Sequence, residues 1–205
     1  MNASSWTAPS PYTLPDLPYA YEAFDPIIGP ETMRLHHDKH HAAYVKAANE
    51  TVERLDGCEA WQLPGLLSAL AFNVGGHLLH SQFWNCLSPE PTVPQPGLQS
   101  AVEAQWKTVD AFVEQFTAAI TTLSGAGWAV LSFEPNTSRL VIQQVHDHQG
   151  SIICDASPII VADAWEHAYY LDHRNDKAKW AESFFSVLNW DHAERQFTVA
   201  CSKGL

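Results

Sequence analysis

The spacing of the apolar residues changes once along this chain, and this change constrains the fold more than any other feature. Up to about residue 123 the apolar residues follow the period of helices, whereas beyond residue 126 three runs have the length and composition of strands. Helices followed by a small sheet predict an α+β fold. The 205 residues, 46% of them hydrophobic, suffice for one domain or for two small domains that share a core.

The first half is predicted to be a helical hairpin. Its two helices span residues 30–57 and 64–87, and helices joined by so short a connection pack as an antiparallel pair. Gly75 and Gly76 interrupt the second, strongly apolar helix. This interruption indicates that another group approaches the backbone closely there.

The second half is predicted to hold a three-stranded antiparallel sheet and further helices. Residues 88–97 contain four prolines and are predicted to link the halves. The elements expected beyond the linker are a helix at 98–123, strands at 127–134, 139–147 and 157–163, and helices at 176–190 and 191–203. Asp191 and Glu194 are expected to form a capping-box-like start of the last helix. We therefore expect an N-terminal hairpin domain at 1–90 and a C-terminal domain at 91–205.

The acidic composition argues against broad binding to nucleic acid or anionic lipid. Asp and Glu number 23 against 11 Lys and Arg, which gives a formal net charge of -12. No apolar run is long enough to span a bilayer, and the opening residues lack the basic and apolar regions of a secretory signal. We expect a cytoplasmic protein with neither a nucleic-acid nor a membrane partner.

Histidines are concentrated in the stretch MRLHHDKHHAAYV, residues 33–45, which holds four of the eleven in the chain. With a helical period, His36, His40 and Tyr44 share one stripe, and His37 and His41 share the next. A solvated helix face also tolerates histidine, so this stretch alone does not identify a binding site.

Two further segments place histidine and aspartate in apolar surroundings. His77 and His80 lie three positions apart on the apolar second helix, so at least one of them points into the core. Asp163 follows a buried strand and His167 comes four residues later, although an aspartate at a strand end is often only a helix cap.

Taken together, His36, His80, Asp163 and His167 predict a metal site. They come from separate elements, and an unpaired carboxylate in apolar surroundings is costly, so a buried ion would satisfy all four groups. Three imidazoles and one carboxylate suit manganese, iron or zinc better than calcium or magnesium. Spacing leaves open whether the metal is redox-active.

Five blocks of the sequence resemble the iron/manganese superoxide dismutase family, in the correct order from about Pro11 to Trp190. They are YTLPDLPYAYEAFDPIIG, HHDKHHAAYV, GGHLLHSQFW, DAWEHAYYLDHRN and VLNWD, of which the DxWEHAYY stretch is the most specific. The resemblance implies an antioxidant enzyme that disproportionates superoxide to dioxygen and hydrogen peroxide. It also implies one manganese or iron ion per subunit, alternating between its +3 and +2 states.

The resemblance also implies roles for single residues. The metal ligands would be His36, His80 rather than His77, Asp163 and His167, with a solvent molecule as the fifth ligand. His40 and Tyr44 would form a gateway pair that relays protons and restricts access to small species.

Glu166 and Tyr170 match family residues that reach across a dimer interface, the glutamate to the partner's ligand histidine and the tyrosine to its gateway histidine. Orienting a metal-bound imidazole through its second nitrogen is the usual task of such a carboxylate. A homodimer is therefore the expected unit, and a homotetramer stays open.

The residue that hydrogen-bonds the metal-bound solvent bears on the choice of metal. The resemblance places His148 where manganese enzymes commonly carry a glutamine, with Gln149 as the alternative. Gly76 stands where many iron enzymes carry their glutamine, so manganese is slightly favoured over iron.

Two other classes of protein fit the sequence less well. A silent homologue filled with zinc, which has no redox chemistry, is opposed by the intact gateway and ligand residues. A di-metal carboxylate bundle needs Glu-x-x-His pairs, and the sequence contains none.

Overall fold

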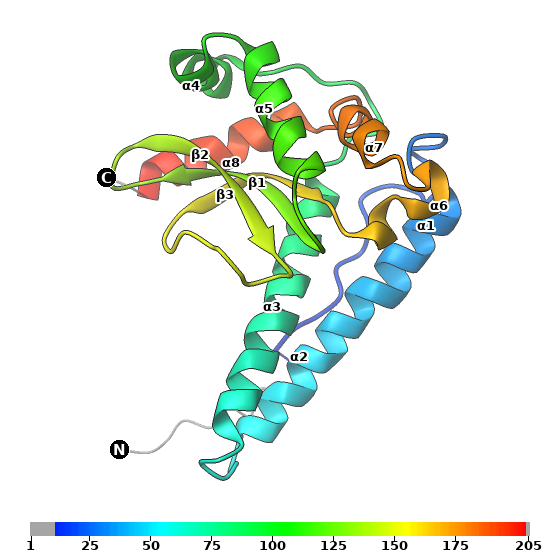
Figure 1. Cartoon of the computed structure of the whole chain (residues 1–205), viewed down its shortest axis with the longest axis vertical. Helices are drawn as coiled ribbons and strands as arrows, with labels where there is room; N and C mark the ends of the chain where they lie inside the picture. Colours follow the sequence, from blue (N-terminus) through cyan, green and yellow to red (C-terminus); the bar gives the residue numbers. More distant parts are fainter. Residues whose placement is uncertain (1–10, 204–205) are drawn as a thin grey trace.

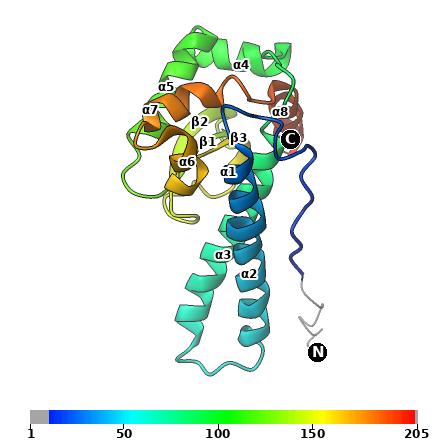
Figure 2. The same cartoon turned by 90° about the vertical axis from the view of Figure 1, so that its right-hand side faces the viewer.

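The computed structural model describes residues 11–203, and its N-terminal half is the expected antiparallel helical hairpin (Figure 1). The first arm is continuous through α1 (Pro30–Leu35), η1 (His36–His41) and α2 (Ala42–Leu55). The second arm is α3 (Leu63–Asn85), which packs along α2. Figure 2 shows the hairpin extending away from the rest of the molecule.

The first arm differs from the expected α-helix at the histidine-rich stretch. Residues His36–His41 form a π-helical segment, in which each turn holds one residue more than an α-turn. Such segments are rare and are frequent at functional sites. The segment begins at His36, the first of the predicted metal ligands.

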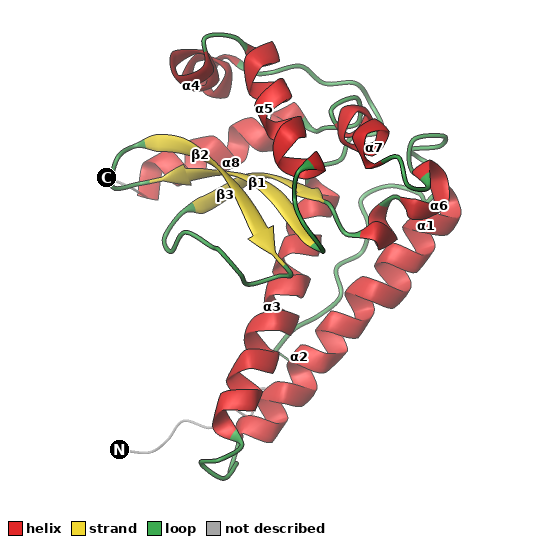
Figure 3. Cartoon of the chain, viewed as in Figure 1, coloured by secondary structure: helices red, strands yellow, loops and turns green. Residues whose placement is uncertain are grey.

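The C-terminal half contains one antiparallel sheet and the remaining helices, so the predicted α+β fold is confirmed (Figure 3). Its elements are α4 (Pro96–Trp106), α5 (Val109–Thr121), β1 (Gly127–Glu134), β2 (Arg139–His146), β3 (Ser157–Asp163), η2 (Glu166–Ala168), α6 (Tyr170–His173), α7 (Lys177–Phe184) and α8 (Trp190–Lys203). The strand order is β2-β1-β3, so the central strand β1 pairs with both others. Trp128 on β1 pairs with Asp163 on β3, and this register fixes the position of Asp163 relative to β1.

The single helix predicted at residues 98–123 is wrong, because the structure breaks it into α4 and α5. Lys107 has a φ of 75°, in the left-handed region that ends a helix. Thr108 then caps α5 by accepting a hydrogen bond from the amide of Ala111 at 3.1 Å. The apolar period continues across this break, so the period alone did not reveal it.

The capping box predicted from Asp191 and Glu194 is also wrong. Asn189 caps α8 instead, since its side-chain oxygen accepts a hydrogen bond from the amide of His192 at 2.9 Å. The carboxylate of Glu194 turns away and accepts a hydrogen bond from the amide of Leu98 on α4, at 2.6 Å.

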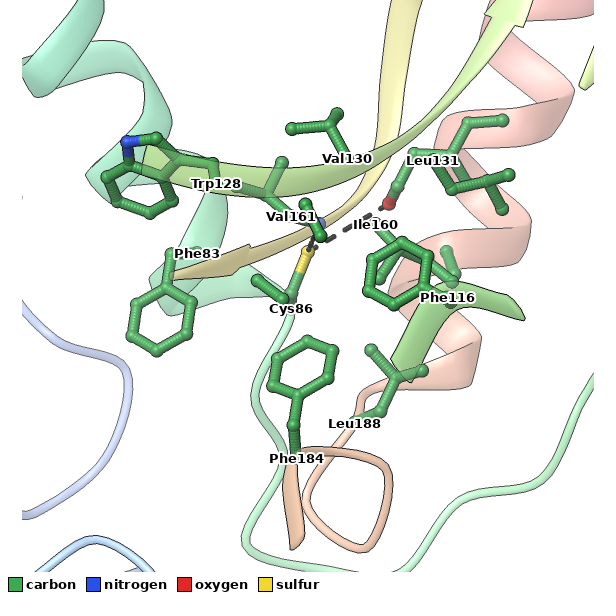
Figure 4. Packing of buried hydrophobic residues seen from close by; sticks show 14 of the residues in the cluster. Phe83, Cys86, Phe116, Trp128, Val130, Leu131, Ile160, Val161, Phe184 and Leu188 are labelled. Atoms are coloured by element: carbon green, nitrogen blue, oxygen red, sulfur yellow. Dashed lines mark hydrogen bonds between the residues drawn. The ribbon is translucent and has the colours of Figure 1, made fainter. Parts of the chain in front are cut away.

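One hydrophobic core joins the end of the hairpin to the sheet (Figure 4). Cys86, directly after α3, is fully buried, and its sulfur accepts a hydrogen bond from the amide of Val161 on β3 at 3.4 Å. Phe83, Phe116 and Phe184 pack in the same cluster. This packing fixes α3 against β3, and these two elements carry two of the predicted ligands.

No helix within residues 11–203 combines the length and the apolar character that a membrane span requires.

Candidate metal centre

The four predicted ligands converge on one point between the hairpin and the sheet. His36 begins η1, His80 lies on α3, Asp163 ends β3 and His167 lies on η2. One potential ligand atom from each side chain lies within 4.8 Å of the other three. His36, His80 and Asp163 are fully buried, and His167 is nearly so. The fold thus brings together residues separated by up to 131 positions in the sequence (167 minus 36).

The carboxylate of Asp163 is the centre of this cluster. Its Oδ2 atom lies 3.0 Å from Nε2 of His36, 3.2 Å from Nε2 of His167 and 3.8 Å from Nε2 of His80. Its Oδ1 atom accepts a hydrogen bond from the amide of Trp165 at 2.8 Å. Asp163 therefore both caps the turn after β3 and directs one oxygen at three imidazoles.

The tautomer of His80 shows that a cation fits this arrangement. Its Nδ1 lies 2.6 Å from the carbonyl oxygen of Gly76, which can only accept, so Nδ1 carries a proton. Nε2 of neutral His80 is then a lone pair that faces the lone pairs of Asp163. Nε2 of His36 and of His80 are both buried without a hydrogen-bond partner among the described residues, although His36 lies close to the carboxylate. Unpartnered buried nitrogens are costly, and a metal ion would satisfy them.

Electrostatics keep the site in the protonation state that metal binding needs. Burial lowers the pKa of His36 to about 4 and lowers the pKa of His80 well below its usual value. Burial alone would raise the pKa of Asp163, but the neighbouring imidazoles of His167 and His36 lower it overall. Neutral imidazoles beside an ionised carboxylate are ready-made metal ligands.

His77, the alternative to His80, belongs to a separate hydrogen-bond chain. The indole N–H of Trp84 donates to Nδ1 of His41 at 2.9 Å, so His41 carries its proton on Nε2. That proton is donated to Nδ1 of His77 at 2.8 Å. His77 therefore orients His41 and Trp84 and does not face Asp163. No local sequence pattern predicts this role of Trp84 and His41.

The predicted gateway residues lie next to two of the predicted ligands. The ring of His40 stacks on His167 with centroids 4.3 Å apart, and the ring of Tyr44 lies 5.2 Å from that of His80. Both side chains are partly exposed, so they lie between the cluster and solvent. Burial, together with the charges of Asp163 and Asp147, raises the pKa of Tyr44 to about 12, and its phenol is protonated at neutral pH.

His148 is completely buried beside Tyr44, with ring centroids 4.5 Å apart. The indole N–H of Trp128 donates to Nδ1 of His148 at 3.0 Å, so a neutral His148 keeps its proton on Nε2. This Nε2 has no partner among the described residues and is free to donate. Gln149, the alternative donor, is exposed and accepts a hydrogen bond from the amide of His148.

The close approach predicted at Gly75 and Gly76 is confirmed. A Cβ atom at Gly75 would overlap the carbonyl oxygen of His148, and one at Gly76 would lie 2.8 Å from Cγ of Tyr44. Only glycine lets α3 approach these two neighbours so closely.

Glu166 and Tyr170, the predicted interface residues, lie at the surface beside His167. Tyr170 is 46% exposed, and the exposed Leu171 follows it. Within residues 11–203 neither the Glu166 carboxylate nor the Tyr170 hydroxyl makes a hydrogen bond.

Comparison with known proteins gives two family matches that together span most of the chain. The model described as "Iron/manganese superoxide dismutases, alpha-hairpin domain" matches residues 11–88, and "Iron/manganese superoxide dismutases, C-terminal domain" matches residues 94–196. A manganese superoxide dismutase of Mycolicibacterium fortuitum is 41% identical over 197 residues, which cover 94% of this chain and 95% of that protein.

Two other relatives are named for other metals. A Mn/Fe superoxide dismutase of Propionibacterium freudenreichii subsp. shermanii is 40% identical over 196 residues, covering 92% of this chain and 98% of that protein. An iron superoxide dismutase of Methanothermobacter marburgensis is 38% identical over 193 residues, covering 91% and 96%. Relatives of similar identity are thus named for manganese, for iron and for both.

Replacing the two histidines of α3 separately tests which of them binds metal. We expect His80→Ala to weaken metal binding by roughly 100-fold or more, since loss of even an outer partner of a ligand costs about 10–100-fold. His77→Ala should retain the metal and lose only about 1 kcal/mol of stability with its hydrogen bond to His41. Elemental analysis after loading with manganese and dialysis measures both. Retention by His80→Ala together with loss by His77→Ala would contradict the assignment.

Proposed function

This chain belongs to the iron/manganese superoxide dismutase family, and from that premise we propose that His36, His80, Asp163 and His167 hold its metal ion. The activity is the disproportionation of two superoxide anions into dioxygen and hydrogen peroxide by redox cycling of a single manganese or iron ion. The observation that carries the ligand assignment is the convergence of three imidazole nitrogens on one buried carboxylate oxygen.

The reaction needs an electron carrier and a supply of protons. When bound, manganese or iron supplies the one-electron steps through its +3 and +2 states. One superoxide loses an electron to become dioxygen, and the other gains that electron and two protons to become hydrogen peroxide. The protein must therefore deliver two protons for every peroxide released.

We assign this proton delivery to Tyr44, with His40 beside it. The Tyr44 phenol is protonated at neutral pH and lies between the ligand His80 and solvent, so it has a proton to donate. His40 lies against a second proposed ligand, His167, and the two partly exposed side chains would narrow the approach to the cluster. A small diatomic anion can pass such an opening more readily than a larger metabolite.

We assign His148 as the donor to metal-bound solvent. Its Nδ1 is occupied by Trp128, so the only proton of the neutral ring lies on the unpartnered Nε2. Gly76 has no side chain and therefore offers no competing side-chain amide. A glutamine at this position would collide with the ring of Tyr44. A histidine donor without the iron-type glutamine favours manganese over iron, and this preference is part of the proposal.

The catalytic unit is proposed to be a homodimer. Glu166 and Tyr170 lie at the surface beside His167, and the exposed Leu171 adds apolar surface next to them. A second copy would bury this surface and place its own Glu166 near the ligand histidines. Orientation of a ligand imidazole by a carboxylate is a common feature of metal sites.

Superoxide dismutation by the purified protein, with elemental analysis of the same sample, tests the function. Enzymes of this class reach about 10⁸–10⁹ M⁻¹s⁻¹. We expect a rate in that range that scales with manganese or iron content across partially loaded samples. Protein loaded with zinc serves as the control and should be inactive, because zinc has no redox chemistry. Full occupancy by manganese or iron without activity would overturn the proposal.

Tyr44→Phe separates proton delivery from metal binding. We expect the variant to keep its metal, because Tyr44 contributes only a neighbouring ring to the cluster, and to show slower turnover or altered product inhibition. Removal of a proton donor typically lowers the rate by up to about 10²–10⁴-fold. A smaller decrease in rate would mean that His40 or solvent delivers the proton instead. The variant His36→Ala is the control that should lose metal and activity together. Metal loss in Tyr44→Phe would contradict the assigned role.

Light scattering tests the dimer. Wild-type protein should give twice the 22.8 kDa mass of the chain at micromolar concentration, and Tyr170→Ala should shift the equilibrium toward monomer. Val93→Ala changes a residue of the linker that is 67% exposed, and the mass should not change. Fully active wild-type monomer would exclude the dimer as the catalytic unit.

A further inference from the structure

The helix that carries His36 has no N-terminal cap of its own. Its N-cap residue is Gly29, which has no side chain to accept a hydrogen bond from the first turn. The acceptor comes instead from Asp172 on α6. Asp172 Oδ2 accepts a hydrogen bond from the amide of Gly29 at 3.0 Å and another from the hydroxyl of Thr32 at 2.7 Å.

Gly29 and Asp172 are complementary in space. A Cβ atom at Gly29 would lie 2.6 Å from Oδ1 of Asp172, so a capping side chain at position 29 and the carboxylate at position 172 exclude one another. The partially positive N-terminus of a helix favours a carboxylate there, whichever segment supplies it.

The neighbouring residue strengthens the same connection. His173 is buried, and its Nε2 donates to the carbonyl oxygen of Ile27 at 2.9 Å. Asp172 and His173 thus hold Ile27, Gly29 and Thr32 by three hydrogen bonds that span 140 to 146 positions of sequence. We call these five residues the clasp.

The clasp lies close in sequence to ligands on both sides. Thr32 is buried and stands four positions before His36, so it lies on the preceding turn of the same arm. Asp172 stands five positions after His167, at the end of the segment that follows β3. The clasp therefore connects the start of the arm that carries His36 with α6, which directly follows the short helix η2 that carries His167.

We propose that Asp172 is a positioning residue for the metal centre: by capping α1 from α6, it fixes His36 relative to His167. The inference rests on the ligand set proposed above. The helix N-terminus could have been capped by a serine or asparagine at position 29. A cap supplied from α6 does more, because it also restrains the two halves of the site against each other.

The fold contains a matched control for this proposal. Glu194 on α8 accepts the amide hydrogen of Leu98 in the first turn of α4, and a Cβ atom at Gly97 would collide with its carboxylate. α4 likewise has no side-chain cap of its own. Glu194 thus caps a helix from a distance as Asp172 does, but α4 carries none of the four ligands.

The test is the rate at which manganese-loaded protein releases its metal to excess chelator, measured well below the unfolding temperature. Asp172→Ala should release manganese roughly fivefold faster than wild type, a factor that matches the loss of one helix cap. Glu194→Ala should lower the urea midpoint to a similar extent but release manganese at the wild-type rate. Asp172→Asn keeps an acceptor oxygen for Gly29 and Thr32, and it should stay within about twofold of wild type.

The double variant Gly29→Ser/Asp172→Ala separates positioning from helix stability. Serine restores a cap to α1 without restoring the connection to α6. We expect the urea midpoint to recover while metal release stays fast. Recovery of slow release in the double variant, equal acceleration by Glu194→Ala, or wild-type release by Asp172→Ala would each overturn the proposal. If wild-type protein itself binds neither manganese nor iron, the ligand set fails, and the role of Asp172 fails with it.

Discussion

The burial of the Asp163 carboxylate is the constraint on which the rest of the structure depends. An ionised carboxylate buried without a counter-charge lowers the stability of the fold by roughly several kcal/mol, even after the surrounding protein has relaxed. Hydrogen bonds fix the position of Asp163. Its main-chain carbonyl accepts a hydrogen bond from the indole N–H of Trp180, and Oδ1 of its side chain accepts one from the amide of Trp165. The other side-chain oxygen, Oδ2, faces the imidazoles. The charge cannot move to solvent, so the surroundings must supply a cation. The neutral rings of His36 and His80 can offer lone pairs, and a bound metal ion would supply the charge.

Tryptophan side chains decide which protons the surrounding histidines carry. An indole nitrogen can only donate, so each histidine nitrogen that faces one must be an acceptor. Trp84 thereby sets the tautomer of His41, and Trp128 sets that of His148. Burial lowers the pKa of both histidines, to about 3 for His41 and about 4 for His148, and this favours the same neutral rings. The aromatic residues around the site therefore do more than exclude water.

The sequence predicted what is encoded locally and by residue type. The apolar period gave the hairpin and the three strands, and the Gly75-Gly76 pair signalled the close approach that His148 and Tyr44 make. It did not predict the break at Lys107, because the apolar period continues through it. It also misplaced the capping of α8, since Glu194 instead serves α4. Caps supplied from 96 or 143 positions away depend on tertiary proximity, which no local pattern records.

Diffraction from crystals of the metal-loaded protein, measured above and below the manganese and iron absorption edges, tests the central claim most directly. The account predicts one anomalous peak per subunit, at bonding distance from Nε2 of the three histidines and from Oδ2 of Asp163. The edge at which the peak appears identifies the metal. A fully loaded, active protein whose only anomalous peak lies away from these four side chains would contradict the account.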